Sequence, residues 1–147
     1  MMNDASVPEA DRIAVEKAIH DAIGWALTKD LTRLFSIVAQ DENFFIFHPD
    51  SKSTIAGFEA FQQLGERVWL REEFKATDFA IRDLRLNFAA LGNVAWYACR
   101  LDDHAEWNGQ PIGWDNCRWT GVLEKRNGQW VIVQMHFSFA TDELKPS

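Results

Sequence analysis

The chain has 147 residues, of which 47% are hydrophobic, so it is long enough to bury the core of one domain. It carries 22 acidic and 15 basic residues, a formal net charge of −7, and this acidic balance argues against binding to nucleic-acid phosphates. No uninterrupted apolar run approaches the length of a membrane span, roughly 20 residues, so we expect no membrane partner.

The start of the chain and its cysteines bear on the cellular compartment of the protein. The opening residues, MMNDASVPEADR, lack the basic and apolar segments of a signal peptide, and Cys99 and Cys117 form no CxxC pair. We therefore expect a cytoplasmic protein without disulfides. Since the sequence contains no repeat and no internal linker, residues 1–147 are expected to form one domain.

The aromatic content is unusual. Seven Trp and eleven Phe stand against a single tyrosine, Tyr97. A tryptophan buries a large area and still needs a partner for its indole N–H. So many in a short chain indicate either a thick core together with a subunit interface, or a cavity with aromatic walls.

Helical periodicity dominates the first part of the chain. The segment Ser6-Val7-Pro8-Glu9 has the pattern of a capping box with Pro in the first turn. Asp30 is expected to cap a short second helix that runs through Leu34 and Ile37. Between them a helix is predicted to end near Thr28, because apolar residues recur at helical spacing at Val15, Ala18, Ile19, Ala22, Ile23, Ala26 and Leu27.

A short strand and a third helix come next. The apolar run from Asn43 to His48 predicts the strand, and Pro49-Asp50-Ser51 is typical of a turn that closes it. Helical spacing then predicts a third helix that carries Phe58, Phe61, Leu64, Val68 and Trp69.

After residue 73 the pattern changes to long strands joined by hairpins. Strands this long predict a strongly bent sheet, with Gly113 and Gly121 as positions for a bulge or bend. Helices followed by an antiparallel meander predict an α+β fold, in which a curved, mostly antiparallel sheet wraps over three helices as a cone with an internal pocket. Three turn signals, Gly92-Asn93, Asn108-Gly109 and Asn127-Gly128, delimit the strands at about 74–90, 94–106, 111–126 and 129–140.

The last two strands carry the pattern T-x-V-hydrophobic-x-K-R-[DN]-G-x-W, followed by H-x-S. Here it reads Thr120-Gly121-Val122-Leu123-Glu124-Lys125-Arg126-Asn127-Gly128-Gln129-Trp130, and the strand ends in His136-Phe137-Ser138. This pattern resembles the closing hairpin of the SnoaL-like family, part of the nuclear transport factor 2-like superfamily. The order of the upstream elements, with Gly57-Phe58-Glu59-Ala60 opening the third helix, also fits, so the resemblance covers about residues 9–140.

The resemblance implies a cystatin-like, cone-shaped α+β fold with an internal pocket, and it says little about activity. The superfamily includes steroid isomerase-like enzymes, dehydratases, polyketide cyclases, ligand binders and a kinase oligomerisation hub. Two classes of function therefore stay open. One is a cofactor-free isomerase, dehydratase or cyclase, and the other is a non-catalytic ligand-binding or oligomerisation module.

His48 is the first candidate catalytic residue. Steroid isomerase-like relatives carry a general-base Asp directly before a Pro at the end of the short strand, and here His48 precedes Pro49. A histidine can act as a base near neutral pH. The alternative is a histidine at the edge of a loop that caps the Pro49-Asp50 turn. Trp25 stands where these relatives carry a phenol on the first helix, and we assign it to the ligand pocket.

Arg100 interrupts an apolar strand. A buried guanidinium needs a carboxylate partner or an anionic ligand. Kinase-hub relatives carry a pocket-lining Arg at the matching position, and alternation puts Trp96 on the same strand face. We therefore expect Arg100 and Trp96 in the pocket, with Arg100 holding the anionic group of a ligand. The alternative is a structural ion pair between Arg100 and Asp102 or Asp115.

The strand after Arg100 is expected to direct Asp115, Cys117 and Trp119 towards the cavity, because the same relatives turn the Trp119 face inwards. Asp115 can serve as an acid, a base or the partner of Arg100. Cys117 fits a small buried hydrophobe better than a nucleophile. A bulge at Gly113 or Gly121 would exchange the two faces of this strand.

The last strand has one wholly apolar face, which carries Met135 and Phe137, and the resemblance to hub-type relatives, which turn the Phe137 position inwards, implies that these two residues line the pocket. Its other face carries His136, which is ranked below His48 and expected at a subunit interface. We expect a homodimer built on the convex face of the sheet, because the long strands are apolar on both faces while three helices can cover only one.

No metal and no cofactor are expected. The four histidines lie on separate predicted elements without an H-x-x-x-H spacing, and no glycine-rich phosphate loop is present. The sequence as a whole predicts a protein that binds a small, partly apolar molecule bearing a carboxylate or enolate. The candidate catalytic residues are His48, Arg100 and Asp115, and the candidate ligand contacts are Trp25, Trp96, Cys117, Trp119, Met135 and Phe137.

Overall fold

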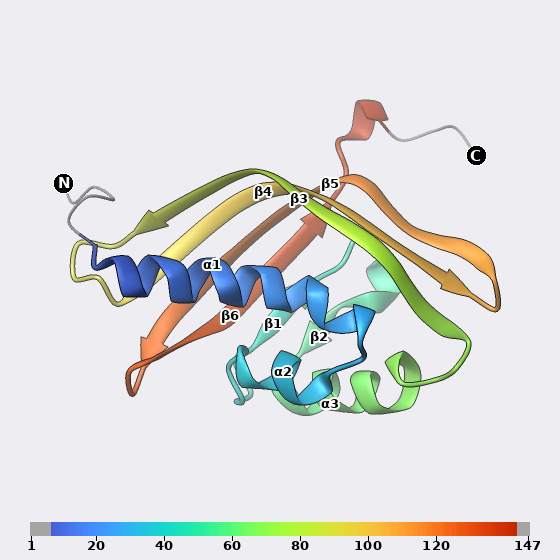
Figure 1. Cartoon of the computed structure of the whole chain (residues 1–147), viewed down its shortest axis with the longest axis horizontal. Coiled ribbons are helices and arrows are strands. Elements are labelled where there is room, and N and C mark those ends of the chain that lie inside the picture. Colours follow the sequence, from blue (N-terminus) through green and yellow to red (C-terminus); the bar gives the residue numbers. More distant parts are fainter. Residues whose placement is uncertain (1–6, 144–147) are drawn as a thin grey trace.

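Six strands form one curved sheet, and three helices lie against its concave side (Figure 1), which confirms the α+β cone expected from the sequence. The computed structural model describes residues 7–143. The helices are α1 (Glu9–Gly24), which continues into the 3₁₀ turn η2 (Trp25–Leu27), α2 (Leu31–Ser36), and α3 (Phe58–Leu64), which continues into the π-helical turn η4 (Gly65–Trp69). Further short turns are η3 (Ser51–Ser53) and η5 (Thr141–Glu143).

Four long strands and two short ones make up the sheet. All neighbouring strands are antiparallel except the two that come first and last along the chain, which lie side by side and run parallel to each other. The strands are β1 (Phe45–Phe47), β2 (Ile55–Ala56), β3 (Phe74–Phe88), β4 (Val94–Trp107), β5 (Gln110–Arg126) and β6 (Gln129–Ser138), in the order β2-β1-β6-β5-β4-β3. The predicted turns Asn108-Gly109 and Asn127-Gly128 have positive φ angles of 51–79°, as a two-residue type I′ hairpin requires.

The two capping predictions have different outcomes. The helix α1 begins at Glu9, directly after Pro8, and Ser6 of the predicted capping box lies outside the described residues. Asp30 caps α2 as predicted, since its carboxylate accepts a hydrogen bond from the backbone N–H of Arg33 at 3.0 Å.

Asp21 joins α1 to α2 from within the apolar stripe of α1. It is only 1% exposed and accepts hydrogen bonds from Lys17 at 2.7 Å and from Arg33. Burial by itself raises the pKa of Asp21, but the hydrogen bonds from the two cations outweigh burial and hold this pKa below its ordinary value. The carboxylate therefore stays ionised and holds α2, and the segment that leads into β1, against α1.

One extra residue in β5 changes the register between β4 and β5. From the hairpin turn the pairs run in step as far as Asp103, which lies opposite Trp114. The next pair is Leu101 opposite Cys117, so two residues of β5 face a single residue of β4. This arrangement is a β-bulge, which bends the strand and shifts the pairing.

Side chains on the convex face hold the two bulge residues, Asp115 and Asn116. Asn116 has a positive φ of 55°, a conformation that asparagine tolerates better than most residues. Its backbone N–H donates to Asp102 at 2.8 Å, and Arg82 binds the same carboxylate through two nitrogens at 2.9 and 3.2 Å. The side-chain oxygen of Asn116 also accepts a hydrogen bond from Arg100 at 3.3 Å.

The bulge decides which face of β4 looks inwards. Trp119 is fully buried, and the shifted register places it opposite Cys99 instead of Ala98. Residues directly opposite each other in an antiparallel pair share a face. The inward-facing residues of β4 are therefore Tyr97, Cys99, Leu101, Asp103 and Ala105.

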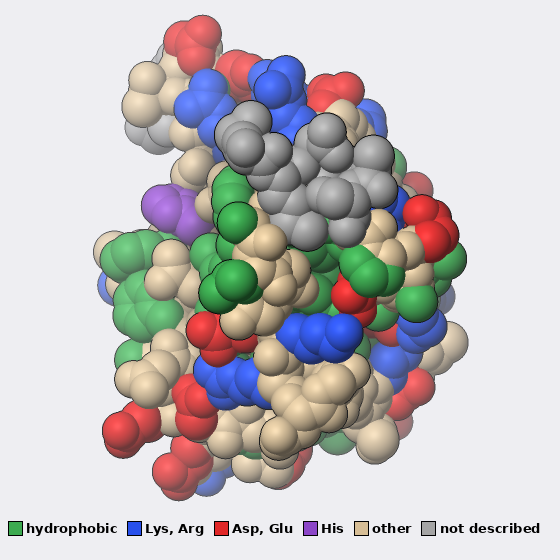
Figure 2. All heavy atoms as spheres, turned by 90° about the vertical axis from the view of Figure 1, so that its left-hand side faces the viewer, with side chains coloured by type: hydrophobic (Ala, Val, Ile, Leu, Met, Phe, Trp, Pro, Cys, Tyr) green, Lys and Arg blue, Asp and Glu red, His purple; other side chains and the backbone are tan. Residues whose placement is uncertain are grey.

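The outer surface mixes charges of both signs. At the end of the molecule where α1 begins, acidic and basic side chains are interspersed (Figure 2). None of the helices within residues 7–143 combines the length and hydropathy of a membrane-spanning segment.

Gly113 allows β5 to approach β4 beside the bulge. A Cβ at this position would lie 2.2 Å from the backbone oxygen of Asp103, and the φ angle of Gly113 is +122°. We predict that Gly113→Ala lowers the free energy of unfolding by about 3 kcal/mol or more, because the strained φ and the clash add together. Urea unfolding followed by tryptophan fluorescence measures this loss.

Gly109→Ala provides the control for this substitution. Gly109 also has a positive φ, +79°, but a Cβ there would meet nothing within 4 Å. Its loss should be about 1 kcal/mol, the cost of the backbone conformation alone. Equal losses in the two variants would contradict the importance of the close contact at Gly113.

Candidate functional site

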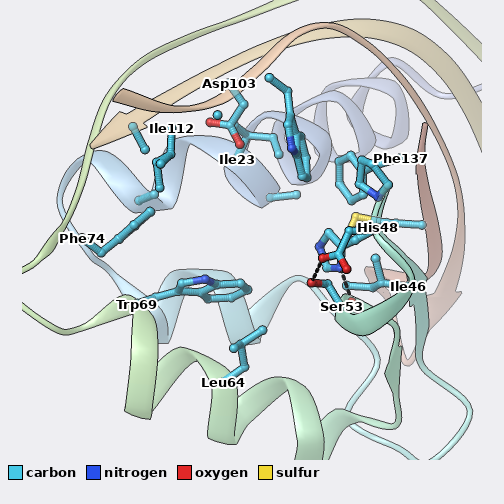
Figure 3. A pocket seen from close by; sticks show the side chains of 18 of the residues that line it. Ile23, Ile46, His48, Ser53, Leu64, Trp69, Phe74, Asp103, Ile112 and Phe137 are labelled. Atoms are coloured by element: carbon cyan, nitrogen blue, oxygen red, sulfur yellow. Dashed lines mark hydrogen bonds between the residues drawn. The ribbon is translucent and has the colours of Figure 1, made fainter. Parts of the chain in front are cut away.

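A cavity of about 430 Å³ opens between the concave face of the sheet and the helices (Figure 3). Asp103 and Ile112 enter it from the sheet, Trp69 lies across the cavity from them, and His48 lies beside Phe137 on a third side. Of the described residues that line the cavity, none is a Lys or an Arg, and the ionisable ones are His48, Asp50 and Asp103. Six aromatic side chains form most of its wall: Trp25, Phe61, Trp69, Phe74, Trp114 and Phe137.

His48 belongs to both a turn and the pocket wall. Its Nδ1 donates a hydrogen bond to the backbone carbonyl of Ser53 at 2.6 Å, and its ring stacks on Phe137 with centroids 5.4 Å apart. Burial lowers the pKa of His48, and the Ser53 carbonyl and Asp50 oppose this shift only in part. At pH 7 His48 is therefore neutral, with its proton on Nδ1 and a lone pair on Nε2.

Asp103 reaches into the same cavity from β4. Its side chain is half-buried, and within residues 7–143 the carboxylate makes no hydrogen bond and no ion pair. Burial raises the pKa of Asp103 to about 6, and His104 on the other face of the strand lowers it only in part. A carboxyl group with such a pKa in a cleft is a candidate acid or base.

The aromatic residues contact one another around the cavity. The ring centroids of Trp25 and Trp69 lie 5.3 Å apart, and those of Trp114 and Phe137 lie 5.1 Å apart. Within the described part of the chain, the indole N–H groups of the three tryptophans donate no hydrogen bond. The wall therefore offers a ligand both aromatic faces and hydrogen-bond donors.

The predicted site residues are divided between the cavity and the core. Trp119 is fully buried and stacks on Phe137 at 5.5 Å, so it supports the wall from behind. Cys117 is also fully buried, and burial raises its pKa to about 12, so its thiol stays protonated in the core. Four of the predicted residues line the cavity itself: Trp25, His48, Met135 and Phe137.

The prediction that Arg100 and Trp96 line the pocket is wrong, because the bulge turns their face of β4 outwards. The Trp96 side chain is 45% exposed on the convex face. The guanidinium of Arg100 contacts Asn116, and its Nε lies 3.7 Å from Asp83. Arg100 is thus a paired residue of the convex face, although its neighbours are not the aspartates named from the sequence.

The prediction that Asp115 faces the cavity is also wrong, because it is one of the two bulge residues. Its side chain is 85% exposed and accepts a hydrogen bond from Nε2 of His104 at 2.6 Å. Nδ1 of the same ring donates to Asp78 at 2.6 Å, and the two carboxylates raise the pKa of His104. His136 is exposed on the convex face, where its ring contacts Phe47 at 5.4 Å.

Asp103 is the main site residue that the sequence pattern did not bring out. One signal for it existed, since Asp103 is the acid that alternates with Tyr97, Cys99 and Leu101 on an otherwise apolar strand face. Trp114 had no such signal, because only the bulge turns it inwards. Over residues 7–143, no group of three or more His, Cys, Asp or Glu side chains is arranged to hold a metal ion.

Sequence comparison identifies a domain family. The family model described as a SnoaL-like domain matches residues 15–142. Among curated protein sequences, none matches the chain.

Solved structures share the fold at low sequence identity. An NTF2-like protein from Cytophaga hutchinsonii superimposes with a TM-score of 0.70 and 11% identity, covering 95% of this chain and 100% of that one. A proposed scytalone dehydratase from Novosphingobium aromaticivorans gives 0.69 and 11%, with 95% and 91% covered. The association domain of CaMKII from C. elegans gives 0.67 and 17%, with 93% and 100% covered. At these identities the likeness shows the fold alone.

The raised pKa of Asp103 predicts a pH-dependent cost to stability. The unfolded carboxyl has a pKa of 3.8 and the folded one about 6, so the folded state binds this proton more tightly. Stability therefore falls as the pH rises from 3.8 to about 6 and stays lower above that range. We predict that Asp103→Asn, which keeps the shape and removes the charge, stabilises the protein at pH 8 by about 1–3 kcal/mol. Urea unfolding should show this gain shrinking towards pH 4.

The matched control is Asp115→Asn, which removes the same charge from a carboxylate outside the cavity. Because Asp115 is hydrogen-bonded to His104, its removal should give no gain in stability. A similar gain in both variants would assign the effect to the net charge of −7 instead of to the pocket.

Proposed function

The chain belongs to the SnoaL-like domain family, and we propose that its cavity binds a small, largely apolar molecule and moves a proton on it without a cofactor. The observation that carries this proposal is the position of two titratable groups, His48 and Asp103, in one aromatic cavity. Burial raises the pKa of Asp103 to about 6, within the range where protons are exchanged near neutral pH, and it lowers the pKa of His48, so that His48 is a neutral proton acceptor at pH 7.

The two groups suit different parts of a proton transfer. His48 is neutral at pH 7 and held by Ser53 in the tautomer whose Nε2 accepts a proton. Asp103 with a pKa of about 6 is mostly ionised at pH 7 but takes up a proton easily. A substrate proton can therefore pass to one group and return from the other, which is what an isomerisation or a dehydration requires.

Charge that develops on a substrate oxygen needs hydrogen-bond donors. The indole N–H groups of Trp25, Trp69 and Trp114 are candidates, because within the described residues they donate to no protein acceptor. Donors that a folded protein holds in place stabilise a developing oxyanion more than freely reorienting water does. This set of groups supports a neutral carbonyl compound as substrate, and the described wall holds no cation that would fix a carboxylate.

We predict that the protein accelerates deuterium exchange from D₂O at the α-carbon of small apolar ketones. Acetophenone, 2-tetralone and cyclohexanone followed by proton NMR are suitable probes. The rate should rise as the pH passes through about 6 and then level off, since Asp103 can accept a proton only in its ionised form.

Single substitutions test which groups carry the exchange. Asp103→Asn and His48→Gln should each lower the rate by about 100-fold or more. His136→Gln changes a histidine on the convex face and should keep the wild-type rate. Exchange at the wild-type rate in the Asp103 and His48 variants would refute the proposed chemistry.

A second candidate function is assembly, which the convex face favours. One row across the strands joins Trp96, Val122, Gln134 and Phe45, and the adjacent row contains Phe47, which is 48% exposed. The helices lie on the other side of the sheet and leave this face uncovered (Figure 1). The structural neighbour that is an association domain supports an assembling role for this fold. We propose a homodimer in which two such faces pack together.

Sedimentation velocity tests the dimer. The wild type should sediment as a dimer at micromolar concentration, and Trp96→Asp should shift it to monomer because a charge would be buried in the interface. Leu91→Asp is the control, since Leu91 is 87% exposed in the turn between β3 and β4. A wild-type monomer would refute this proposal.

A further inference from the structure

We propose that the cavity recognises a positively charged amine, a ligand with an apolar body that ends in an ammonium group. This inference rests on the cavity being the ligand site proposed above, but it requires no reaction to take place there. It is carried by the charges of the lining residues and by the aromatic character of the wall.

The first step concerns the two carboxylates at the cavity. Asp50 is already engaged, because it accepts hydrogen bonds from the backbone N–H of Lys52 at 2.8 Å and from the hydroxyl of Ser53. Asp103 has no hydrogen-bond partner in the described part of the chain. A half-buried carboxylate without a partner is unfavourable, and an ammonium group would supply both the missing donor and the opposite charge.

The second step concerns the walls. Trp25 packs against Trp69 on one side, and Trp114 packs against Phe137 on another, so the space in front of Asp103 is bounded by aromatic rings. The faces of aromatic rings attract cations, and cages of such rings bind ammonium groups. The apolar body of the ligand would replace water against the remaining aliphatic wall.

The third step concerns ligands of other charge, which the lining residues disfavour. A ligand carboxylate would meet Asp103 with like charge, and no described lining residue offers it a Lys or an Arg. His48 is neutral at pH 7 and does not repel a cation, so its Nε2 stays available as an acceptor while Asp103 holds the ammonium. The titratable groups that face Asp103 or lie beside it are His48 and Asp50 in the cavity, His104 on the other face of the strand, and Cys117 on β5, whose thiol stays protonated.

Three probes of one shape but different charge test this inference. They are 2-phenylethylamine, 2-phenylethanol and 3-phenylpropanoate, titrated into the full chain by isothermal titration calorimetry at pH 8. The amine should bind at least about tenfold more tightly than the alcohol, and the propanoate should bind most weakly. Equal binding of the amine and the alcohol, or no binding of any probe at millimolar concentration, would overturn the inference.

Proton release identifies the carboxylate involved. At pH 6 free Asp103 is about half protonated, since its pKa is about 6. An ammonium group favours the ionised carboxylate, so binding at pH 6 should release up to about half a proton per amine, and binding at pH 8 almost none. Titration in buffers of different ionisation enthalpy measures this release, and a release that is equal at pH 6 and pH 8 would contradict the role of Asp103.

Two variants complete the test. Asp103→Asn should remove the preference for the amine over the alcohol, and because this variant is predicted to be more stable than the wild type, the loss cannot come from unfolding. Asp115→Asn makes the same change of net charge outside the cavity and should keep the preference. An amine preference that survives in Asp103→Asn would overturn the inference.

The outcome also separates this inference from the proposed reaction. Ketone exchange without amine binding would leave the proton transfer standing and refute the ligand class. Selective amine binding without exchange would support the ligand class and refute the catalysis.

Discussion

The β-bulge at Asp115 and Asn116 is the constraint on which the cavity depends. Side chains along a strand alternate between two faces. One extra residue therefore shifts the pairing by one position and exchanges the faces on which the residues beyond it lie. With Trp119 inside, an unbroken register would bring Arg100 inside as well, whereas the bulge brings Asp103 there. The interior of the cone is acidic and aromatic for this reason. The charged groups that hold the bulge lie on the opposite, convex face, so both faces of the sheet are needed to build the site.

Burial in the cavity acts on His48 and Asp103 through the same physical effect with opposite results. It penalises charge on either group, so the pKa of the histidine falls and that of the carboxyl rises. His48 is thereby kept as a neutral acceptor and Asp103 is brought to a pKa of about 6, which suits the proton transfer proposed above. The ionised form of Asp103 carries a cost in stability, and the tightly packed remainder of the concave face, with Trp119 and Cys117 fully buried, offsets it.

The two faces of the sheet differ in chemical character. The concave face, covered by α1, α2 and α3, holds the cavity and its titratable groups, while the convex face carries an apolar row at one end and a charged network at the other. Solved structures with this fold include one named as a proposed dehydratase and one named as an association domain, so the fold by itself does not fix a function.

Local patterns in the sequence determined the elements of this protein, and the tertiary structure decided which side chains meet. The helical spacing of α1, the cap at Asp30 and the Asn-Gly turns each depend on residues a few positions apart, so they could be predicted, as could the placement of His48 and Phe137 from the family pattern. The inward side of β4 could not. It depends on a single extra residue in the neighbouring strand, held by contacts between Asp102, Arg82 and Asn116 that only the folded chain brings together.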